Sequence, residues 1–283
     1  MIMAIRTWTG WLAAGLMLLA GLAQAAVPQR VVSLGGALTE IVYALNAGDK
    51  LVGVDSSSIY PPAVHQLPKV GYYRAFSVEG VASLQPDLIL ASDQAGPPQA
   101  VDQLRRLGKR VVVLPSAPTL DALEQRIHGV AAAMGLRDDG RALVKQIREQ
   151  TAQYTQVKLT QRVLLVSSHT GKLEGAGAET AADAIVKLAG ARNVLGNVKG
   201  YKPISAEAAA ALKPDWIITT SMSVTAQGGL EAFLAQPGIA VTPAAKARRV
   251  LVMDDLLLLG FGPRLPEALR QIQASMLPRR AGK

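Results

Sequence analysis

The feature that most constrains this chain is a repeat at long range. The segment FSVEGVASLQPDLILASDQ contains Glu79 and Asp87, and its counterpart ISAEAAAALKPDWIITTSM contains Glu207 and Asp215. Each copy holds a glutamate, a short helical pattern, a Pro-Asp pair and an apolar strand, and the acidic residues recur after 128 positions (79 to 207, 87 to 215). Because that interval far exceeds the period of a solenoid, the repeat predicts two lobes of like construction.

Strand and helix patterns alternate within each half of the chain. RVVSLGGALTEIVYALNAGDKLVGVD is typical of strand, glycine turn, helix and strand. In the second half, RVLLVSSH predicts a strand that ends at His169, GKLEGAGAET a glycine-rich loop, and TAADAIVKLAG a helix with Thr180 as its N-cap. LLLLGFGPR is predicted as a loop before a closing helix. This alternation indicates an α/β fold built from parallel βα units, with ligands at the carboxyl ends of the strands.

The two halves are separated by a charged segment without internal proline. It predicts one helix of about 20 residues, roughly 30 Å long, with no strand inside it. We therefore divide the chain into four parts, which are a signal peptide (1–25), an N-terminal lobe (26–136), a linker helix (137–159) and a C-terminal lobe (160–283).

The N-terminus predicts secretion. Arg6 precedes an apolar run, and Ala23-Gln24-Ala25 has the small-x-small pattern of a cleavage site. The apolar run is too short for a membrane span, so we expect a soluble chain that is not membrane-inserted. The chain contains no cysteine, which leaves no disulfide, no thiolate chemistry and no lipid-anchored cysteine.

Composition excludes some classes of partner. The formal net charge is +9, and a secreted basic protein meets anionic small molecules or membrane surfaces. No basic run with interleaved aromatic residues is present, so nucleic-acid binding is not expected. A GxSxG nucleophile motif is also absent, which argues against a hydrolase of that type.

The segment VGYYRAFSVEG carries the candidate ligand chemistry. It places Tyr72, Tyr73 and Arg74 side by side in a loop between a proline-rich connection and a helix. A phenolate is a hard donor suited to ferric iron, and an arginine can pair with a ligand carboxylate. Taken alone, these residues favour a tyrosine-rich loop that packs on its own lobe. A secreted enzyme with Tyr72 and His169 as an acid/base pair is a less favoured alternative.

Four motifs together resemble a known family. RVVSLGGALTEIVYALNAGDKLVGVD, LPKVGYYRAFSVEGVASLQPDLIL, GAGAETAADAIVKLAGARN and DDLLLLGFGPR are similar to blocks of the class III periplasmic binding proteins of bacterial ABC importers. Within that group they most resemble the haem-binding members of the hemin transport family. The resemblance implies two Rossmann-like lobes joined by one long α-helix, with the ligand between the lobes and a periplasmic location.

The resemblance also implies roles for individual residues. Tyr72 would be the axial ligand of ferric haem (ferric protoporphyrin IX), with Tyr73 as its rival, and Arg74 would support the phenolate or contact a propionate. His169 would face the same cleft from the second lobe, as a ligand or as a bystander. Arg264, in GFGPR, would either offer a positive charge near the cleft or have a surface role.

The implied function is transport rather than catalysis. The chain would carry haem as a monomer to an ABC permease dimer for iron acquisition. Glu79 and Glu207, one on each lobe, would dock to arginines of the two permease subunits. A ferric siderophore or cobalamin carried by the same fold is the alternative.

Overall fold

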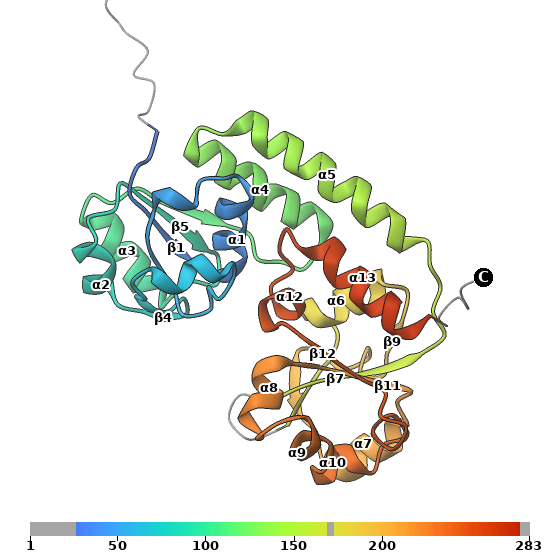
Figure 1. The fold of residues 1–283 in the computed structure, drawn as a ribbon. Coiled ribbons are helices and arrows are strands. Elements are labelled where there is room, and N and C mark those ends of the chain that lie inside the picture. The colour runs from blue at the N-terminus through green and yellow to red at the C-terminus, as the bar shows by residue number, and fades with distance from the viewer. Residues whose placement is uncertain (1–26, 169–172, 278–283) are drawn as a thin grey trace, which may run out of the picture.

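The computed structural model describes residues 27–168 and 173–277, which form two α/β lobes (Figure 1). The signal peptide predicted over 1–25, and His169, lie outside the described residues. The N-terminal lobe contains β1 (Val31–Leu34), α1 (Gly36–Ala44), η1 (Gly48–Lys50), β2 (Leu51–Val54), η2 (Pro62–Gln66), β3 (Gly71–Tyr72), β4 (Ala75–Phe76), α2 (Val78–Ser83), β5 (Leu88–Ser92), α3 (Pro98–Arg106), β6 (Val111–Leu114) and α4 (Leu120–Met134).

A long helix, α5 (Arg137–Thr155), leads to the second lobe. The C-terminal lobe contains β7 (Arg162–Ser167), β8 (Glu174–Ala176), α6 (Ala181–Leu188), β9 (Arg192–Asn193), β10 (Tyr201–Pro203), α7 (Ala206–Leu212), β11 (Trp216–Thr220), α8 (Ser221–Ala226), α9 (Leu230–Leu234), α10 (Pro237–Ala240), α11 (Pro243–Lys246), β12 (Val250–Met253), α12 (Asp255–Leu259) and α13 (Leu265–Met276). The predicted fold, two α/β lobes joined by a long helix, is confirmed. The boundaries that we set at 136 and 160 stay a prediction.

The sheet of the N-terminal lobe is parallel throughout, in the order β2-β1-β5-β6. Successive side chains of a strand point to opposite faces of its sheet. On β1, Val31 belongs to one apolar cluster and Val32 to another, and neither is exposed to solvent. Apolar side chains of α1 and α4 lie in the first cluster, and those of α2 and α3 lie in the second. Helices therefore cover both faces of this sheet, as expected of buried parallel strands.

The sheet of the C-terminal lobe is mixed. Strands β7, β9, β11 and β12 are parallel, but β8 pairs with β7, and β10 with β8, in the antiparallel sense. The prediction of a loop over GKLEGAGAET is therefore wrong at β8. Its glycines allow backbones to approach closely, since a Cβ on Gly177 would lie 1.9 Å from the carbonyl oxygen of Val198.

The loop predicted over LLLLGFGPR is also wrong in part, because α12 occupies its beginning. The side chain of Asp254 caps this helix, with its carboxylate accepting a hydrogen bond from the backbone N–H of Leu257 at 2.9 Å. Only the GFGPR portion, residues 260–264, connects α12 to α13.

The repeated segments form matching structures. Ser77 and Ser205 cap α2 and α7 in the same way, each accepting a hydrogen bond from the backbone N–H three residues on. In the N-terminal lobe, Arg30 donates its backbone N–H to Asp87 and its guanidinium to the Leu84 carbonyl.

In the C-terminal lobe, Arg162 makes the same two contacts, with Asp215 and with the carbonyl of Leu212. The prediction of two lobes of like construction is thereby confirmed down to individual hydrogen bonds.

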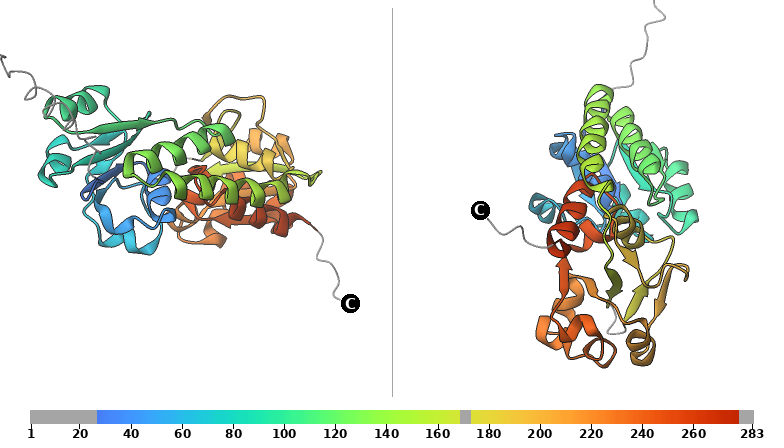
Figure 2. Two further views of the ribbon diagram at one scale, coloured as in Figure 1. Left: turned by 90° about the horizontal axis from the view of Figure 1, so that it is seen from above. Right: turned by 90° about the vertical axis from the view of Figure 1, so that its right-hand side faces the viewer.

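Helices make the connection between the lobes. Helix α5 packs on α4 of the first lobe and on α13 of the second, and Figure 2 shows these helices running alongside one another. Gln273 of α13 donates a hydrogen bond from its side chain to the carbonyl of Tyr154, near the end of α5, at 2.7 Å. No helix among the described residues is long and apolar enough to cross a membrane.

Candidate ligand-binding site

The predicted tyrosine loop is a short hairpin, formed by β3 and β4 around the two-residue turn Tyr73-Arg74. Gly71 starts it with a φ of 101°, in the region that favours glycine, and a Cβ there would lie 3.2 Å from the carbonyl oxygen of Ala75. We call residues 71–76 the tyrosine hairpin.

The tyrosine hairpin is tied to the carboxyl ends of the sheet strands. Its Gly71 carbonyl accepts a hydrogen bond from the N–H of Ser56 at 2.8 Å, directly after β2. The Tyr73 carbonyl accepts another from the N–H of Gly96 at 2.9 Å, after β5. These bonds hold the hairpin at the edge where α/β sheets bind ligands.

Tyr72 presents its phenol to solvent beside an arginine. The guanidinium of Arg74 donates a hydrogen bond from Nη1 to the Tyr72 hydroxyl at 2.6 Å, and 44% of Tyr72 is exposed. The same guanidinium lies 4.5 Å from the centre of the Tyr73 ring, where it makes a cation–π contact. The Tyr72 oxygen is thus both accessible to solvent and held in place by Arg74.

Tyr73 lies in a different environment although it is the next residue. It is half-buried and packs against the apolar cluster that contains Val70, Phe76 and Val81. Burial raises the pKa of the Tyr73 phenol, and the neighbouring Tyr72 raises it further. Tyr73 is therefore held as a neutral, packed ring, whereas Tyr72 is open to a ligand.

A buried carboxylate, Asp55, organises the loops under the hairpin, and the sequence analysis missed it. Its oxygens accept hydrogen bonds from the Gly35 N–H (3.0 Å), from the N–H and hydroxyl of Ser57 (2.9 and 2.6 Å), and from the Ser58 hydroxyl (2.8 Å). The N–H of Tyr73 adds a contact at 3.3 Å. The signal in the sequence was an aspartate followed by three serines at the end of a strand.

A third tyrosine, Tyr201, approaches the hairpin from the second lobe. It begins β10 and 42% of it is exposed. Burial among the surrounding atoms raises the pKa of the Tyr201 phenol, whereas the positive charge of Arg74 lowers it, and Tyr72 is close enough to raise it. The charges of Arg74 and Tyr72 thus reach Tyr201, which places this residue of the second lobe near the hairpin. Nothing in the sequence pattern of this residue indicated that position.

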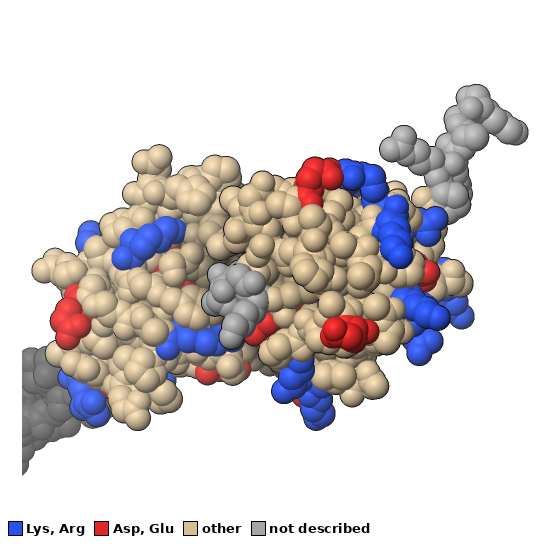
Figure 3. All heavy atoms as spheres, turned by 90° about the horizontal axis from the view of Figure 1, so that it is seen from below, with Lys and Arg blue, Asp and Glu red and all other residues tan. Residues whose placement is uncertain are grey.

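Figure 3 shows the face of the molecule seen from below. Most of its described surface belongs to residues other than Lys, Arg, Asp and Glu, and both basic and acidic side chains are present on it.

A cavity lies elsewhere between the lobes. It has a volume of about 320 Å³ and is lined by Pro118, Thr119, Leu120, Asp121, Ala184, Leu188 and Phe261. Its lining includes none of Tyr72, Tyr73, Arg74 and Tyr201, so this cavity is not the candidate site.

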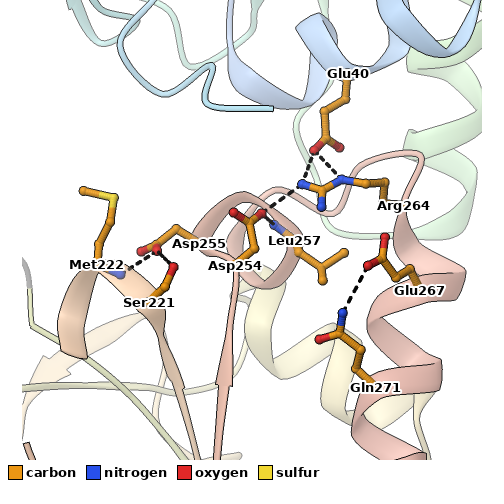
Figure 4. A network of polar contacts seen from close by, with 9 residues as sticks. All are labelled: Glu40, Ser221, Met222, Asp254, Asp255, Leu257, Arg264, Glu267 and Gln271. Carbon is orange, nitrogen blue, oxygen red and sulfur yellow. Dashed lines mark hydrogen bonds and ion pairs between the residues drawn. The ribbon is translucent and has the colours of Figure 1, made fainter. Parts of the chain in front are cut away.

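Arg264 takes part in a network of polar contacts with two carboxylates. Its guanidinium donates hydrogen bonds from Nε and Nη2 to Glu40 Oε1, at 2.8 and 2.5 Å, and from Nη2 to Asp254 Oδ1 at 2.9 Å (Figure 4). It also lies 3.6 Å from the centre of the Tyr60 ring. Glu40 belongs to α1, so this ion pair joins the two lobes. A role of Arg264 toward a ligand stays a prediction, and the geometry assigns its charge to the junction.

A second arginine reinforces this junction. Arg126, a buried residue of α4, donates from Nη2 to the carbonyl of Phe261 at 2.6 Å. The GFGPR segment is thus held to the first lobe at both ends, at Phe261 and at Arg264.

The comparisons with known proteins agree with this geometry. The model of a family described as periplasmic binding protein matches residues 31–257. The chain belongs to the periplasmic binding protein family. A relative from Bacillus subtilis (strain 168), the ABC transporter substrate-binding lipoprotein YvrC, is 30% identical over 259 residues, which are 89% of this chain and 81% of the relative. The vitamin B12-binding protein of Pectobacterium atrosepticum is 36% identical over 106 residues, 38% of either chain.

Two solved structures are similar to this periplasmic binding protein over nearly their whole length. The haem-binding protein RhuT from Roseiflexus sp. RS-1, in apo form, has a TM-score of 0.84 and 36% identity, covering 88% of this chain and 97% of RhuT. The haem-binding protein BhuT, in complex with two haems, has a TM-score of 0.80 and 41% identity, covering 88% and 99%.

The remaining predicted residues of this periplasmic binding protein lie apart from the hairpin or outside the described part of the chain. Glu79 and Glu207 are exposed in the first turns of α2 and α7, equivalent positions on the two lobes. Hydrogen bonds from its own backbone N–H and from Ser205 lower the pKa of Glu207. His169 falls outside the described residues, and its role stays a prediction.

Proposed function

We propose that this periplasmic binding protein carries ferric haem between its lobes, with Tyr72 as the axial ligand, and passes it to an ABC importer. The observation that carries the proposal is the exposed Tyr72 phenol with the Arg74 guanidinium bonded to its oxygen at 2.6 Å. The similarity to haem-binding proteins over nearly the whole chain supports the same ligand.

The chemistry of the site fits ferric iron. A phenolate is a hard anionic donor, and tyrosine is among the side chains that hold haem iron. Arg74 favours the phenolate by its charge and leaves other N–H groups of its guanidinium for a propionate. Tyr73 fits less well as the ligand because burial favours its neutral form.

The transport step involves the outer faces of the lobes. We propose that Glu79 and Glu207 contact arginines of the permease dimer, and that the protein acts as a periplasmic monomer after cleavage of its signal peptide. The matched placement of the two glutamates, each in the first turn behind a serine cap, supports a two-fold contact.

A second candidate ligand is cobalamin. The match to a vitamin B12-binding protein supports it, although that match covers only 38% of either chain. Cobalamin needs no phenolate from the protein, so the Tyr72–Arg74 pair favours haem.

A titration with hemin followed by absorption spectroscopy tests the proposal. We expect a high-spin ferric spectrum with a phenolate-to-iron charge-transfer band in the wild type, and no such band in Tyr72→Phe. Tyr154→Phe, on α5, is the matched control and should bind as the wild type does. Binding of cyanocobalamin with no binding of hemin would replace haem by cobalamin as the ligand.

A further inference from the structure

Met222 is a large apolar side chain left exposed where the second lobe faces the first. It is the second residue of α8, which begins as soon as β11 ends, and 54% of it is exposed. Figure 4 shows its side chain pointing away from α8, toward the N-terminal lobe. The carboxyl end of a parallel strand is where such sheets bind ligands.

The backbone beneath this side chain is fixed. The N–H of Met222 donates to Asp255 Oδ2 at 2.9 Å, and the hydroxyl of Ser221 donates to the same oxygen at 3.0 Å. Asp255 is itself buried and follows Asp254, which binds Arg264. The base of Met222 is thus connected to the ion pair between the lobes, while its thioether remains free.

A series of contacts connects the base of Met222 to the tyrosine hairpin. Leu256, next to Asp255, packs so closely on Gly36 that a Cβ there would lie 2.7 Å from it. Gly36 donates its N–H to the Ser57 hydroxyl at 3.1 Å, and Ser57 in turn binds Asp55, which holds the hairpin. Met222 and the hairpin are therefore linked by contacts that cross from the second lobe to the first.

We infer that Met222 packs its thioether against the porphyrin face turned away from Tyr72, and thereby slows ligand release. This inference rests on the proposed function. Methionine suits the role because it is unbranched, polarizable and able to follow the surface of an aromatic ring. A thioether is a soft donor, so it does not compete with the phenolate for ferric iron.

The test measures the rate at which hemin leaves the protein for excess apomyoglobin. Met222→Ala should release hemin about tenfold faster, since burying a methionine side chain contributes on this scale. Met222→Leu restores the volume without sulfur and should stay within about twofold of the wild type. Val241→Ala is the matched control, because Val241 is also exposed and follows α10, at the end of the lobe remote from the hairpin (Figure 1).

Two further readouts separate packing from ligation. The charge-transfer band of Tyr72 should be the same in Met222→Ala as in the wild type. Metal-free protoporphyrin IX should leave Met222→Ala faster than it leaves the wild type, by the same factor as hemin. If hemin left Met222→Ala at the same rate as it leaves the wild type, the inference would be overturned. The inference would also fail if Met222→Leu released hemin as fast as Met222→Ala and had an altered iron spectrum. That result would show that the sulfur ligates the iron. Either result leaves the proposed function standing as long as the wild type shows the Tyr72 band.

Discussion

The carboxylate of Glu40 and the guanidinium of Arg264 form a buried ion pair between the two lobes, with Nη2 and Oε1 2.5 Å apart. Burial raises the pKa of Glu40 to about 7, and the charge of Arg264 only partly opposes that rise. Glu40 is therefore a group at the lobe junction that changes its charge near neutral pH.

The first prediction concerns stability and pH. Because the pKa of Glu40 is raised to about 7 in the folded protein, the folded protein keeps a proton between about pH 4.5 and 7 that the unfolded chain releases. Raising the pH through this window should lower the free energy of unfolding, by at most about 3 kcal/mol from this group. Urea unfolding of the ligand-free protein at pH 5, 6, 7 and 8 measures the effect.

Glu40→Gln provides the comparison, since glutamine has the same shape and does not titrate. We expect a flatter pH dependence in the variant, and a stability at pH 8 equal to or above that of the wild type, because Asp254 still pairs with Arg264. If the free energy of unfolding changed with pH to the same extent in both proteins, Glu40 would not titrate in this range.

The second prediction separates the two adjacent tyrosines. Tyr72→Ala should abolish the charge-transfer band and weaken hemin binding far more than Tyr73→Ala does, because Tyr72 is exposed while burial holds Tyr73 neutral. Tyr73→Ala should chiefly cost stability, through lost packing with its apolar cluster. Hemin titrations and urea unfolding of both variants measure this. Greater loss of affinity in Tyr73→Ala would assign the ligand to Tyr73.

The third prediction concerns Arg74. Its guanidinium is exposed, so the bond to the Tyr72 hydroxyl is screened by solvent and contributes about 1 kcal/mol. Arg74→Ala should therefore weaken hemin binding roughly fivefold without changing the fold. Arg74→Lys keeps the charge but lacks the planar guanidinium group. Its hemin affinity should therefore lie between those of the wild type and of Arg74→Ala. Equal affinities in all three proteins would leave Arg74 without a role in binding.

The fourth prediction concerns Asp55. Asp55→Ala leaves the donors on Gly35, Ser57 and Ser58 without their buried acceptor, so we expect a loss of stability of roughly 3 kcal/mol or more. Because the hairpin loses its support, hemin affinity should fall too, although Asp55 itself does not reach the cleft. Thermal unfolding and hemin titration of the same samples measure both effects. Full affinity at reduced stability would show that the hairpin keeps its shape without Asp55.

Features of the fold that are local in sequence could be predicted, whereas contacts between the lobes could not. The cap at Thr180 was predictable because its partner, the N–H of Asp183, lies only three residues on. Strand β8 escaped prediction because its three residues, Glu174–Ala176, are too few to show a strand pattern. The position of Arg264 depends on Glu40, 224 residues away, and no local pattern indicates such a partner.

The same distinction between local contacts and contacts from one lobe to the other applies to the candidate site. The contact between Tyr72 and Arg74 could be predicted because they are two residues apart and their chemistry is complementary. Tyr201 could not, because only the packing of the two lobes brings it toward Arg74.

The last prediction concerns docking to the permease. Glu79 and Glu207 lie at equivalent positions on the two lobes, and hydrogen bonds lower the pKa of Glu207. Replacing both by lysine places positive charge against the arginines proposed on the permease. Hemin affinity should not change, because neither residue belongs to the hairpin.

Uptake of haem into vesicles that contain the permease should fall by at least tenfold in the double variant, since like charges at a contact oppose association. The control is Glu149→Lys, which makes the same change of charge as each single replacement, at an exposed position of α5. Increasing the salt concentration should narrow the difference between the double variant and the wild type, because salt screens exposed charges. Normal uptake by the double variant at low salt would mean that these glutamates do not orient the protein on its permease.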